Sequence, residues 1–340
     1  MITDIAERKI TAASSKDQLL FSGWVLVRVD QRERLPSVVS HAMAIAAGLR
    51  RRIRLFEVLD PGMAPIARID PVDWDIRKRE TQLHLECLAK IYSRTDLPID
   101  IQVLEHALPS DIGHCDSAEP PILAFGRHKS ELPWHLDEAN RNLLENQCNS
   151  ILMVPDGSKP QVQISYKRLV VPLDGSSRAE AALPAAIAIA RCHDAQLSLV
   201  HVTPRTTLTR NGPLSAEDRD LENLLASRND RVAREYLKVL RDKCSSSGVS
   251  VKTHVMNDGD ARRELLDIAY SMDADLIILN SHGSSGYGDV LSGSVATYIL
   301  EHARLPVLMM GQRAPGTREH LFSGASAPGI RQPGYPVSAV

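Results

Sequence analysis

A stretch rich in glycine and serine, residues 279–295, has the chemistry of an anion-binding loop. Gly283 and Gly293 have nine residues between them, and Ser294 follows directly. Glycine lets backbone N–H groups approach an anion because no side chain stands in the way. A helix predicted over 295–302 would begin here, where free N–H groups and the helix dipole attract phosphate. An ordinary strand-to-helix loop with a serine at the helix start explains the pattern equally well, so the loop alone leaves both interpretations open.

The elements that must position this loop alternate between strand and helix. Short apolar runs in the second half of the chain predict strands at 169–174, 197–202, 249–255, 276–280 and 306–310. Long helices are predicted between them at 177–193 and 216–246. Such alternation implies a parallel sheet covered on both faces. Ligands of these sheets bind beyond the carboxyl ends of the strands, where the strand order reverses, so the residues after the first, second and fourth strands are the informative ones.

The first half of the chain repeats this order. It predicts strands at 24–30, 53–58, 101–105, 122–126 and 150–154, and helices at 36–50 and 74–93. Asp30 and Asp174 stand 144 residues apart at the ends of the first strands, and Val58 and Val202 stand 144 residues apart at the ends of the second strands. The fourth strands are 154 residues apart, so the second half carries about ten extra residues near its long helix. The repeat predicts two similar α/β domains in tandem.

Several segments of the second half together resemble the universal stress protein family. They are YKRLVVPLDGS, LSLVHV, Gly259-Asp260-Ala261, DADLIILNSHG and HARLPVLMM. The nucleotide loop of that family reads Gly-x-x-Gly, nine residues, Gly-Ser/Thr. The resemblance implies two tandem doubly wound parallel-sheet domains of the adenine nucleotide alpha hydrolase-like type. It also implies binding of ATP or a related adenine nucleotide, accompanied by Mg²⁺ when the ligand is a triphosphate.

The resemblance also assigns roles to residues of the second half. Asp174 would meet the ribose, Val202 would meet the adenine, and the glycine loop would hold the phosphates. The nucleotide-binding set implied in this way is Pro172, Leu173, Asp174, Val202, Leu279, Asn280, His282, Gly283, Gly293, Ser294 and Val295. No catalytic or metal-ligating residue is assigned.

Two positions of this set need comment. Asn280 stands where the family motif has its first glycine. Asparagine accepts the left-handed backbone conformation better than most residues, so the loop could keep its shape, although the side chain could crowd the ribose or triphosphate. His282 could donate to a bound phosphate or could pack and hydrogen-bond locally. His201, within the second strand, is expected to be a partly buried structural residue.

The first half resembles the same fold with an eroded site. Its fourth strand leads into Gly126-Arg127-His128-Lys129, nine residues, and then Ala139-Asn140. Lys129 stands at the second glycine of the motif, and Ala139-Asn140 replace Gly-Ser. Arg127 and Lys129 could still hold an anion, and a different ligand such as a lipid or metabolite stays open, but the sequence favours a partner domain that binds no nucleotide.

The repeat and the resemblance set the expected domain boundaries. We expect an N-terminal extension at 1–20, a first domain with a degenerate nucleotide site at 21–155, a linker at 156–165, a second domain at 166–311 and a disordered tail at 312–340. Residues 150–154 and 306–310 are the candidate edge strands for pairing of the two domains, since members of the family commonly pair in that way. The whole chain could dimerise further.

Composition narrows the class of protein. A formal net charge of −2 argues against a nucleic-acid surface. The cluster of arginines over 50–54 is expected to be a solvated helix end and strand start, with a nucleic-acid or anionic-lipid contact as the alternative. Five cysteines without a CxxC argue against a disulfide framework or zinc site and fit a reducing compartment. No signal peptide or membrane-length apolar run is visible, so we expect a cytoplasmic protein without membrane contact.

The motifs favour binding over catalysis. The sequence has no Walker motif, no nucleophile elbow and no HExxH, and the loop offers no lysine or arginine clamp for phosphoryl transfer. We therefore expect a stress-response sensor or regulator, not an enzyme, with slow ATP hydrolysis at most. One alternative is a scaffold of the same fold whose site Asn280 has closed. Another is a nucleotidyl transferase, which would need a catalytic motif after the first strand, where only Asp174-Gly175-Ser176-Ser177 stands.

Overall fold

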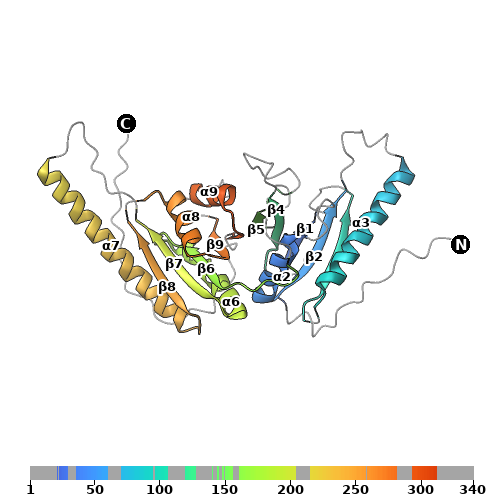
Figure 1. The fold of residues 1–340 in the computed structure, drawn as a ribbon, viewed down its shortest axis with the longest axis horizontal. Helices are drawn as coiled ribbons and strands as arrows, with labels where there is room; N and C mark the ends of the chain where they lie inside the picture. The colour runs from blue at the N-terminus through green and yellow to red at the C-terminus, as the bar shows by residue number, and fades with distance from the viewer. Residues whose placement is uncertain are drawn as a thin grey trace.

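The computed structural model describes residues 21, 23–29, 36–59, 70–94, 96–105, 119–127, 140, 144, 148, 150–155, 161–203, 215–257, 259–281 and 293–311. Within these ranges the strands form one 10-stranded sheet with helices packed on both faces. Figure 1 shows its two halves side by side, with the long helices α3 and α7 at opposite outer ends.

The first half of the sheet comes from residues 23–155. Its elements are β1 (Gly23–Arg28), α2 (Ser37–Leu49), β2 (Arg51–Val58), α3 (Pro71–Tyr92), β3 (Ile99–Leu104), β4 (Ile122–Arg127) and β5 (Ser150–Pro155). β1, β4 and β5 are largely apolar and buried, as expected of strands covered on both faces, whereas the edge strand β3 is only partly buried. α3 starts at Asp70, whose side chain accepts a hydrogen bond from the Val72 N–H at 2.8 Å.

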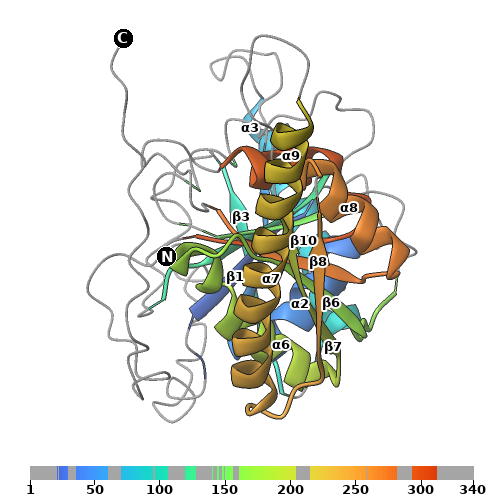
Figure 2. The ribbon, with the colours of Figure 1, turned by 90° about the vertical axis from the view of Figure 1, so that its left-hand side faces the viewer.

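The second half repeats the order. Its elements are β6 (Arg168–Pro172), α5 (Ser177–Glu180), α6 (Leu183–His193), β7 (Gln196–Val202), α7 (Ala216–Ser245), β8 (Val251–Met256), α8 (Ala261–Ser271), β9 (Leu276–Asn280), α9 (Ser294–His302) and β10 (Val307–Met310). α7 has 30 residues against 22 in α3, which confirms the extra length predicted near this helix. A reciprocal capping box between Ser215 and Asp218 starts α7, which runs along the edge strand β8 (Figure 2).

One predicted helix is in fact two. The sequence suggested a single helix over 177–193, whereas α5 ends at Glu180 and α6 begins at Leu183. Pro184 lies in the first turn of α6, where it has no N–H to give to the carbonyl four residues earlier. The break leaves α5 as a separate short turn directly after β6.

The strand order shows where each half reverses the direction in which successive strands are added, which is the switch point of a doubly wound sheet. The order is β3-β2-β1-β4-β5-β10-β9-β6-β7-β8, so each half has the doubly wound arrangement predicted from the sequence. β6 is flanked by β7 on one side and by β9 on the other, both parallel to it. The chain leaves β6 toward β7 and later returns to its other side, so the crevice between β6 and β9 is the switch point of the second half.

The two halves join through their edge strands. β5 and β10 pair antiparallel, with Leu308 opposite Leu152 and Val307 opposite Met153. This confirms the predicted pairing of 150–154 with 306–310. Because the pair is antiparallel, the carboxyl ends of the first-half strands lie beside the start of β10, which matters for the position of α9.

A second contact between the halves lies on the face covered by α2 and α6. A Cβ on Gly48 of α2 would stand 3.0 Å from the Ile189 Cα of α6, so a larger residue would push the two helices apart by a few tenths of an ångström. Next to it, the buried Tyr166 ring lies between His41 of α2 and His193 of α6, at centroid distances of 5.8 Å and 5.2 Å. The His41 Nδ1 is 2.9 Å from the Tyr166 hydroxyl, and the His193 Nε2 is 3.0 Å from the Ala44 carbonyl.

The arginine cluster at 50–54 is less solvated than expected. Arg50 is exposed and closes α2 in the left-handed conformation, as a helix end would. Arg51 is instead buried, and its guanidinium contacts Glu119 at 2.7 Å and the Pro120 carbonyl at 2.8 Å. Arg54 lies over the Trp24 ring at 4.5 Å. The prediction is wrong for Arg51 because β2 is an inner strand, where a long cationic side chain must find partners within the fold.

Candidate functional site

The structure brings the ends of three neighbouring strands together at the switch point of the second half. Pro172 is the last residue of β6, Val202 the last of β7 and Asn280 the last of β9. These strands are parallel neighbours, so their carboxyl ends share one edge of the sheet. α9 starts at the same edge. The described members of the expected site therefore gather where doubly wound folds bind ligands.

The turn after β6 presents Asp174 to solvent. Its Oδ1 accepts hydrogen bonds from the Ser176 N–H at 3.0 Å and from the Ser176 hydroxyl at 2.6 Å. The Ser176 Oγ in turn accepts from the Ala179 N–H and caps α5. Gly175 between them has a φ of +83°, a conformation that favours glycine. The local sequence thus holds the Asp174 carboxylate in a defined orientation at the sheet edge.

His201 holds the start of this turn through a hydrogen bond to the backbone of Leu173. The Leu173 N–H donates to the Val200 carbonyl at 2.8 Å, and the His201 Nδ1 donates to the Leu173 carbonyl at 2.8 Å. Burial lowers the pKa of His201, an effect that the Leu173 carbonyl and the Asp174 charge oppose. The expectation of a partly buried structural histidine is confirmed.

Tyr236 of α7 is a neighbour that the sequence did not single out. Its ring lies 6.1 Å from the His201 ring. Burial raises the pKa of the Tyr236 hydroxyl, and the negative charges of Glu180 and Asp174 raise it further, so the hydroxyl stays protonated.

Asn280 differs from the expectation in two ways. It completes the extended strand β9 and is absent from the described residues with positive φ, so the site does not use asparagine's tolerance of the left-handed conformation. Its buried side chain also points to the backbone of α5, where Nδ2 donates to the Arg178 carbonyl at 2.6 Å. The residue ties β9 to the turn after β6.

The start of α9 is joined to the end of β9. The Gly293 N–H donates to the Ser281 carbonyl at 2.7 Å, and the Gly293 carbonyl accepts from the Thr297 N–H at 2.9 Å. Gly293 is the N-cap, and no side chain among the described residues caps this end. The first-turn N–H groups, including those of Ser294 and Val295, have no acceptor within the helix. Predicted site residues His282 and Gly283 lie outside the described residues.

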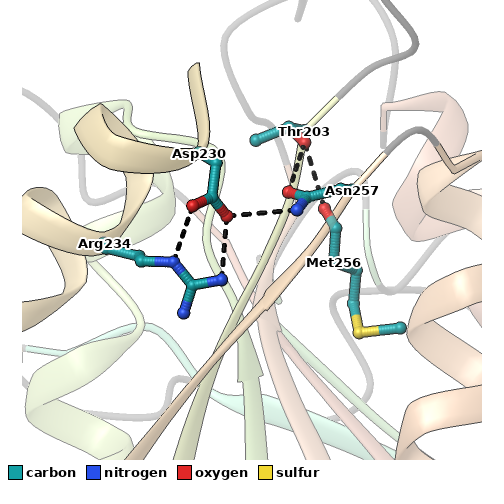
Figure 3. A network of polar contacts seen from close by, with 5 residues as sticks. All are labelled: Thr203, Asp230, Arg234, Met256 and Asn257. Carbon is teal, nitrogen blue, oxygen red and sulfur yellow. Dashed lines mark hydrogen bonds and ion pairs between the residues drawn. The ribbon is translucent and has the colours of Figure 1, made fainter. Parts of the chain in front are cut away.

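A polar network beside Val202 was also missed by the sequence reasoning (Figure 3). The buried Thr203 hydroxyl donates to the Met256 carbonyl at 3.1 Å and to the Asn257 Oδ1 at 3.2 Å. Asn257 donates to Asp230 at 3.1 Å, and Asp230 pairs with Arg234 on α7 at 2.7 Å. The hydrogen bonds from Arg234 and then from Asn257 lower the pKa of Asp230. The network fixes the backbone just after Val202 by tying β7 and β8 to α7.

The corresponding edge of the first half is used differently. Arg127, which the sequence suggested could hold an anion, donates to the Leu300 carbonyl at 2.6 Å and also to the Ala303 carbonyl. Two of its guanidinium N–H groups are therefore used at the end of α9, and an anion-binding role for Arg127 stays a prediction. Asp30, His128, Lys129 and Ala139 lie outside the described residues, while Asn140 is buried.

In the described ranges no three His, Cys, Asp or Glu side chains come together in a way that could hold a metal ion. No helix there is both long and apolar enough to span a membrane.

Comparison with known proteins agrees with the fold and with the motifs. A model of the universal stress protein family matches residues 165–311. Universal stress protein MJ0531 of Methanocaldococcus jannaschii is 30% identical over 148 residues, which are 43% of this chain and 82% of that protein. The chain belongs to the universal stress protein family.

Solved structures extend the likeness in fold to both halves. A universal stress protein from Archaeoglobus fulgidus DSM 4304 covers 85% of this chain and 98% of its own, with a TM-score of 0.56 and 13% identity. A universal stress protein from Archaeoglobus fulgidus, solved in complex with dAMP, covers 43% of this chain and 99% of its own, with a TM-score of 0.30 and 23% identity.

Proposed function

We propose that the second half of this universal stress protein binds ATP or a related adenine nucleotide and acts as a sensor or regulator in the stress response. The site would lie at the carboxyl ends of β6, β7 and β9. The observation that carries the proposal is the start of α9 at the switch point. Gly293 is its N-cap, and the Gly293 N–H is hydrogen-bonded to the Ser281 carbonyl directly after β9.

The phosphates would bind at this helix start. The first-turn N–H groups carry partial positive charge, and the helix dipole adds to it. Gly293 has no side chain to shield them, and the exposed Ser294 hydroxyl would add a donor. His282 and Gly283 would complete the loop as the family motif implies. Mg²⁺ would accompany a triphosphate, held through the phosphate oxygens.

The ribose and base would lie over the neighbouring strands. The exposed Asp174 carboxylate accepts hydrogen bonds and suits the ribose hydroxyls. Val202, the half-buried last residue of β7, would contact the adenine, with the Thr203 network holding its backbone. Pro172, Leu173 and Leu279 line the same edge and would complete the pocket.

Asn280 need not close this pocket. Its side chain is buried, and its amide is held by the Arg178 carbonyl at 2.6 Å. This geometry favours nucleotide binding over a scaffold whose site is closed.

We also propose little or no catalysis. Residues 281–294, which connect β9 to α9, contain no lysine or arginine, and sites of phosphoryl transfer use such a cation to stabilise the transition state. The first half, 21–155, would act as a partner that binds no nucleotide, connected through 156–165 to the second domain at 166–311. A cytoplasmic location and dimerisation of the chain belong to the same proposal.

Gly293→Val tests the site with little risk to the fold. Gly293 has a φ of −69°, which any residue adopts, and among the described residues a Cβ there would meet the Ser281 carbonyl alone, at 3.7 Å. The valine methyls would nevertheless stand over the first-turn N–H groups. Gly126→Val is the matched control in the first half, since a Cβ there meets no described atom within 4 Å. Calorimetric titration with Mg-ATP should show binding by the wild type and the control and at least about tenfold weaker binding by Gly293→Val. Equal affinity in all three proteins would place the nucleotide elsewhere.

A further inference from the structure

One side chain of the first half reaches the helix that forms the proposed phosphate site. The Arg127 guanidinium at the end of β4 donates one N–H to the Leu300 carbonyl at 2.6 Å and another to the Ala303 carbonyl. Both carbonyls belong to the carboxyl-terminal turn of α9. The contact joins residues that are 173 and 176 positions apart in the chain.

The antiparallel pairing of β5 with β10 explains this contact. α9 connects β9 to β10, so its last turn lies beside the start of β10. That end of β10 is at the same edge as the carboxyl ends of β4 and β5. Figure 1 shows α9 on the side of the second half that faces β4 and β5. α9 has 9 residues, so Arg127 and the proposed phosphate site are separated by a rigid segment about 13 Å long.

The chemistry of the contact stabilises the helix in one position. The last carbonyls of a helix have no N–H partner within it, and they carry partial negative charge. A guanidinium has a planar fork of donors that can bind two such carbonyls at once, which fixes orientation as well as distance. A lysine in the same place would make a point contact and would orient the helix less well.

The second half has no arginine at the position that corresponds to Arg127. With the fourth strands 154 residues apart, the second-half counterpart of Arg127 is Ser281. Its short side chain donates to the Asn280 Oδ1 at 3.4 Å, within its own half. The first half therefore lacks the nucleotide motif but supplies the arginine, and the second half carries the motif without an equivalent arginine.

We propose that Arg127 is a positioning residue through which the first half sets the affinity of the second half for the phosphate groups of its ligand. The inference rests on the proposed nucleotide binding. Arg127 touches no ligand in this account. It holds α9 so that the first-turn N–H groups of Ser294 and Val295 meet the phosphates, while contacts to the nucleoside do not depend on it.

The experiment compares the full-length wild type with Arg127→Gln and Arg127→Lys. The matched control is Arg191→Gln, which removes a guanidinium that donates to the Ser247 carbonyl at 2.7 Å, away from α9. Each protein is titrated calorimetrically with Mg-ATP and, separately, with adenosine. Amide hydrogen exchange of 294–302 is measured on the proteins without nucleotide.

We expect Arg127→Gln to weaken ATP binding by about tenfold, Arg127→Lys to weaken it by less, and the control to match the wild type. Adenosine affinity should change by less than about twofold, because the nucleoside contacts stay in place. Exchange in α9 should become faster in Arg127→Gln, to a smaller extent in Arg127→Lys, and not in the control. A general loss of fold would weaken both ligands together and would overturn the inference.

The outcomes separate this inference from the proposed function. Wild-type binding of ATP that Arg127→Gln leaves unchanged would overturn the role of Arg127 and leave the nucleotide site standing. No binding of ATP by the wild type would overturn the proposed function and this inference together. Unchanged exchange in α9 would also contradict the positioning role.

Discussion

The contact between the two halves around Tyr166 should lose stability in acid because of His41. Burial lowers the pKa of this histidine from 6.5 to about 4 in the folded protein. Tyr166 of the second half is its neighbour, with the hydroxyl 2.9 Å from the His41 Nδ1, and the Tyr166 ring in turn contacts the His193 ring. Burial raises the pKa of Tyr166, with the Asp275 charge adding to it, and burial also lowers the pKa of His193.

The direction in which the free energy of unfolding changes with pH follows from proton binding at His41. Between pH 6.5 and pH 4 the unfolded chain binds a proton at His41 that the folded chain does not bind. The free energy of unfolding therefore falls as the pH falls through this window, and the stability that His41 contributes is fully present only above pH 6.5. From pH 7 to pH 5 the loss due to His41 is about 2 kcal/mol, and it approaches about 3 kcal/mol below pH 4.

Urea unfolding at pH 7 and pH 5 measures this effect. His41→Gln keeps a hydrogen-bonding group near Tyr166 but cannot take up the proton. Between the two pH values the wild type should lose about 2 kcal/mol more than the variant, because the other histidines are present in both proteins and cancel. Parallel loss of stability in the two proteins would refute the assignment of the pH dependence to His41.

Three further changes should alter stability in defined ways. Gly48→Leu should destabilise the protein by about 1–3 kcal/mol in urea unfolding, because a Cβ would stand 3.0 Å from the Ile189 backbone. Asn280→Gly should cost about 1 kcal/mol by removing the hydrogen bond to α5, and it should leave ATP affinity in calorimetry within about twofold. Glu119→Gln should lower the free energy of unfolding by about 1–2 kcal/mol, because it removes the charge that faces the buried Arg51.

Each of these three variants has its own control or contrary result. Gly126→Ala, where a Cβ meets no described atom within 4 Å, is the control for Gly48→Leu, and an equal effect of both would contradict the packing argument. Much tighter ATP binding by Asn280→Gly would mean that the asparagine side chain crowds the ligand after all. A stability of Glu119→Gln equal to that of the wild type would show that another partner satisfies Arg51.

The fold could be predicted well because its signal is local and repeated. Strands such as β9 and β10 are largely apolar runs, and the same order of elements occurs twice, so each half supports the interpretation of the other. The pairing of β5 with β10 came from the resemblance to a family. The boundary between α5 and α6 was missed because the alanine-rich run conceals a helix break that depends on one proline.

Side-chain partners were predicted poorly because they depend on distant parts of the chain. Nothing near Arg127 in the sequence indicates that α9, more than 170 residues away, supplies its acceptors. Asn280 appeared to be a replacement for a flexible glycine, whereas the structure uses its amide to join β9 to α5. The Thr203–Asn257–Asp230–Arg234 network combines two strand ends and a helix, and no spacing along the chain shows it.

The central claim is tested most directly by the nucleotide content of the purified wild-type protein. The protein is denatured, the supernatant is separated on an anion-exchange column with mass detection, and the stripped protein is titrated with Mg-ATP. The account predicts an adenine nucleotide that is retained or rebound at one per chain, and that is lost in Gly293→Val but kept in Gly126→Val. No released nucleotide, together with no binding heat at millimolar ATP, would contradict it and would favour a scaffold that acts through protein partners.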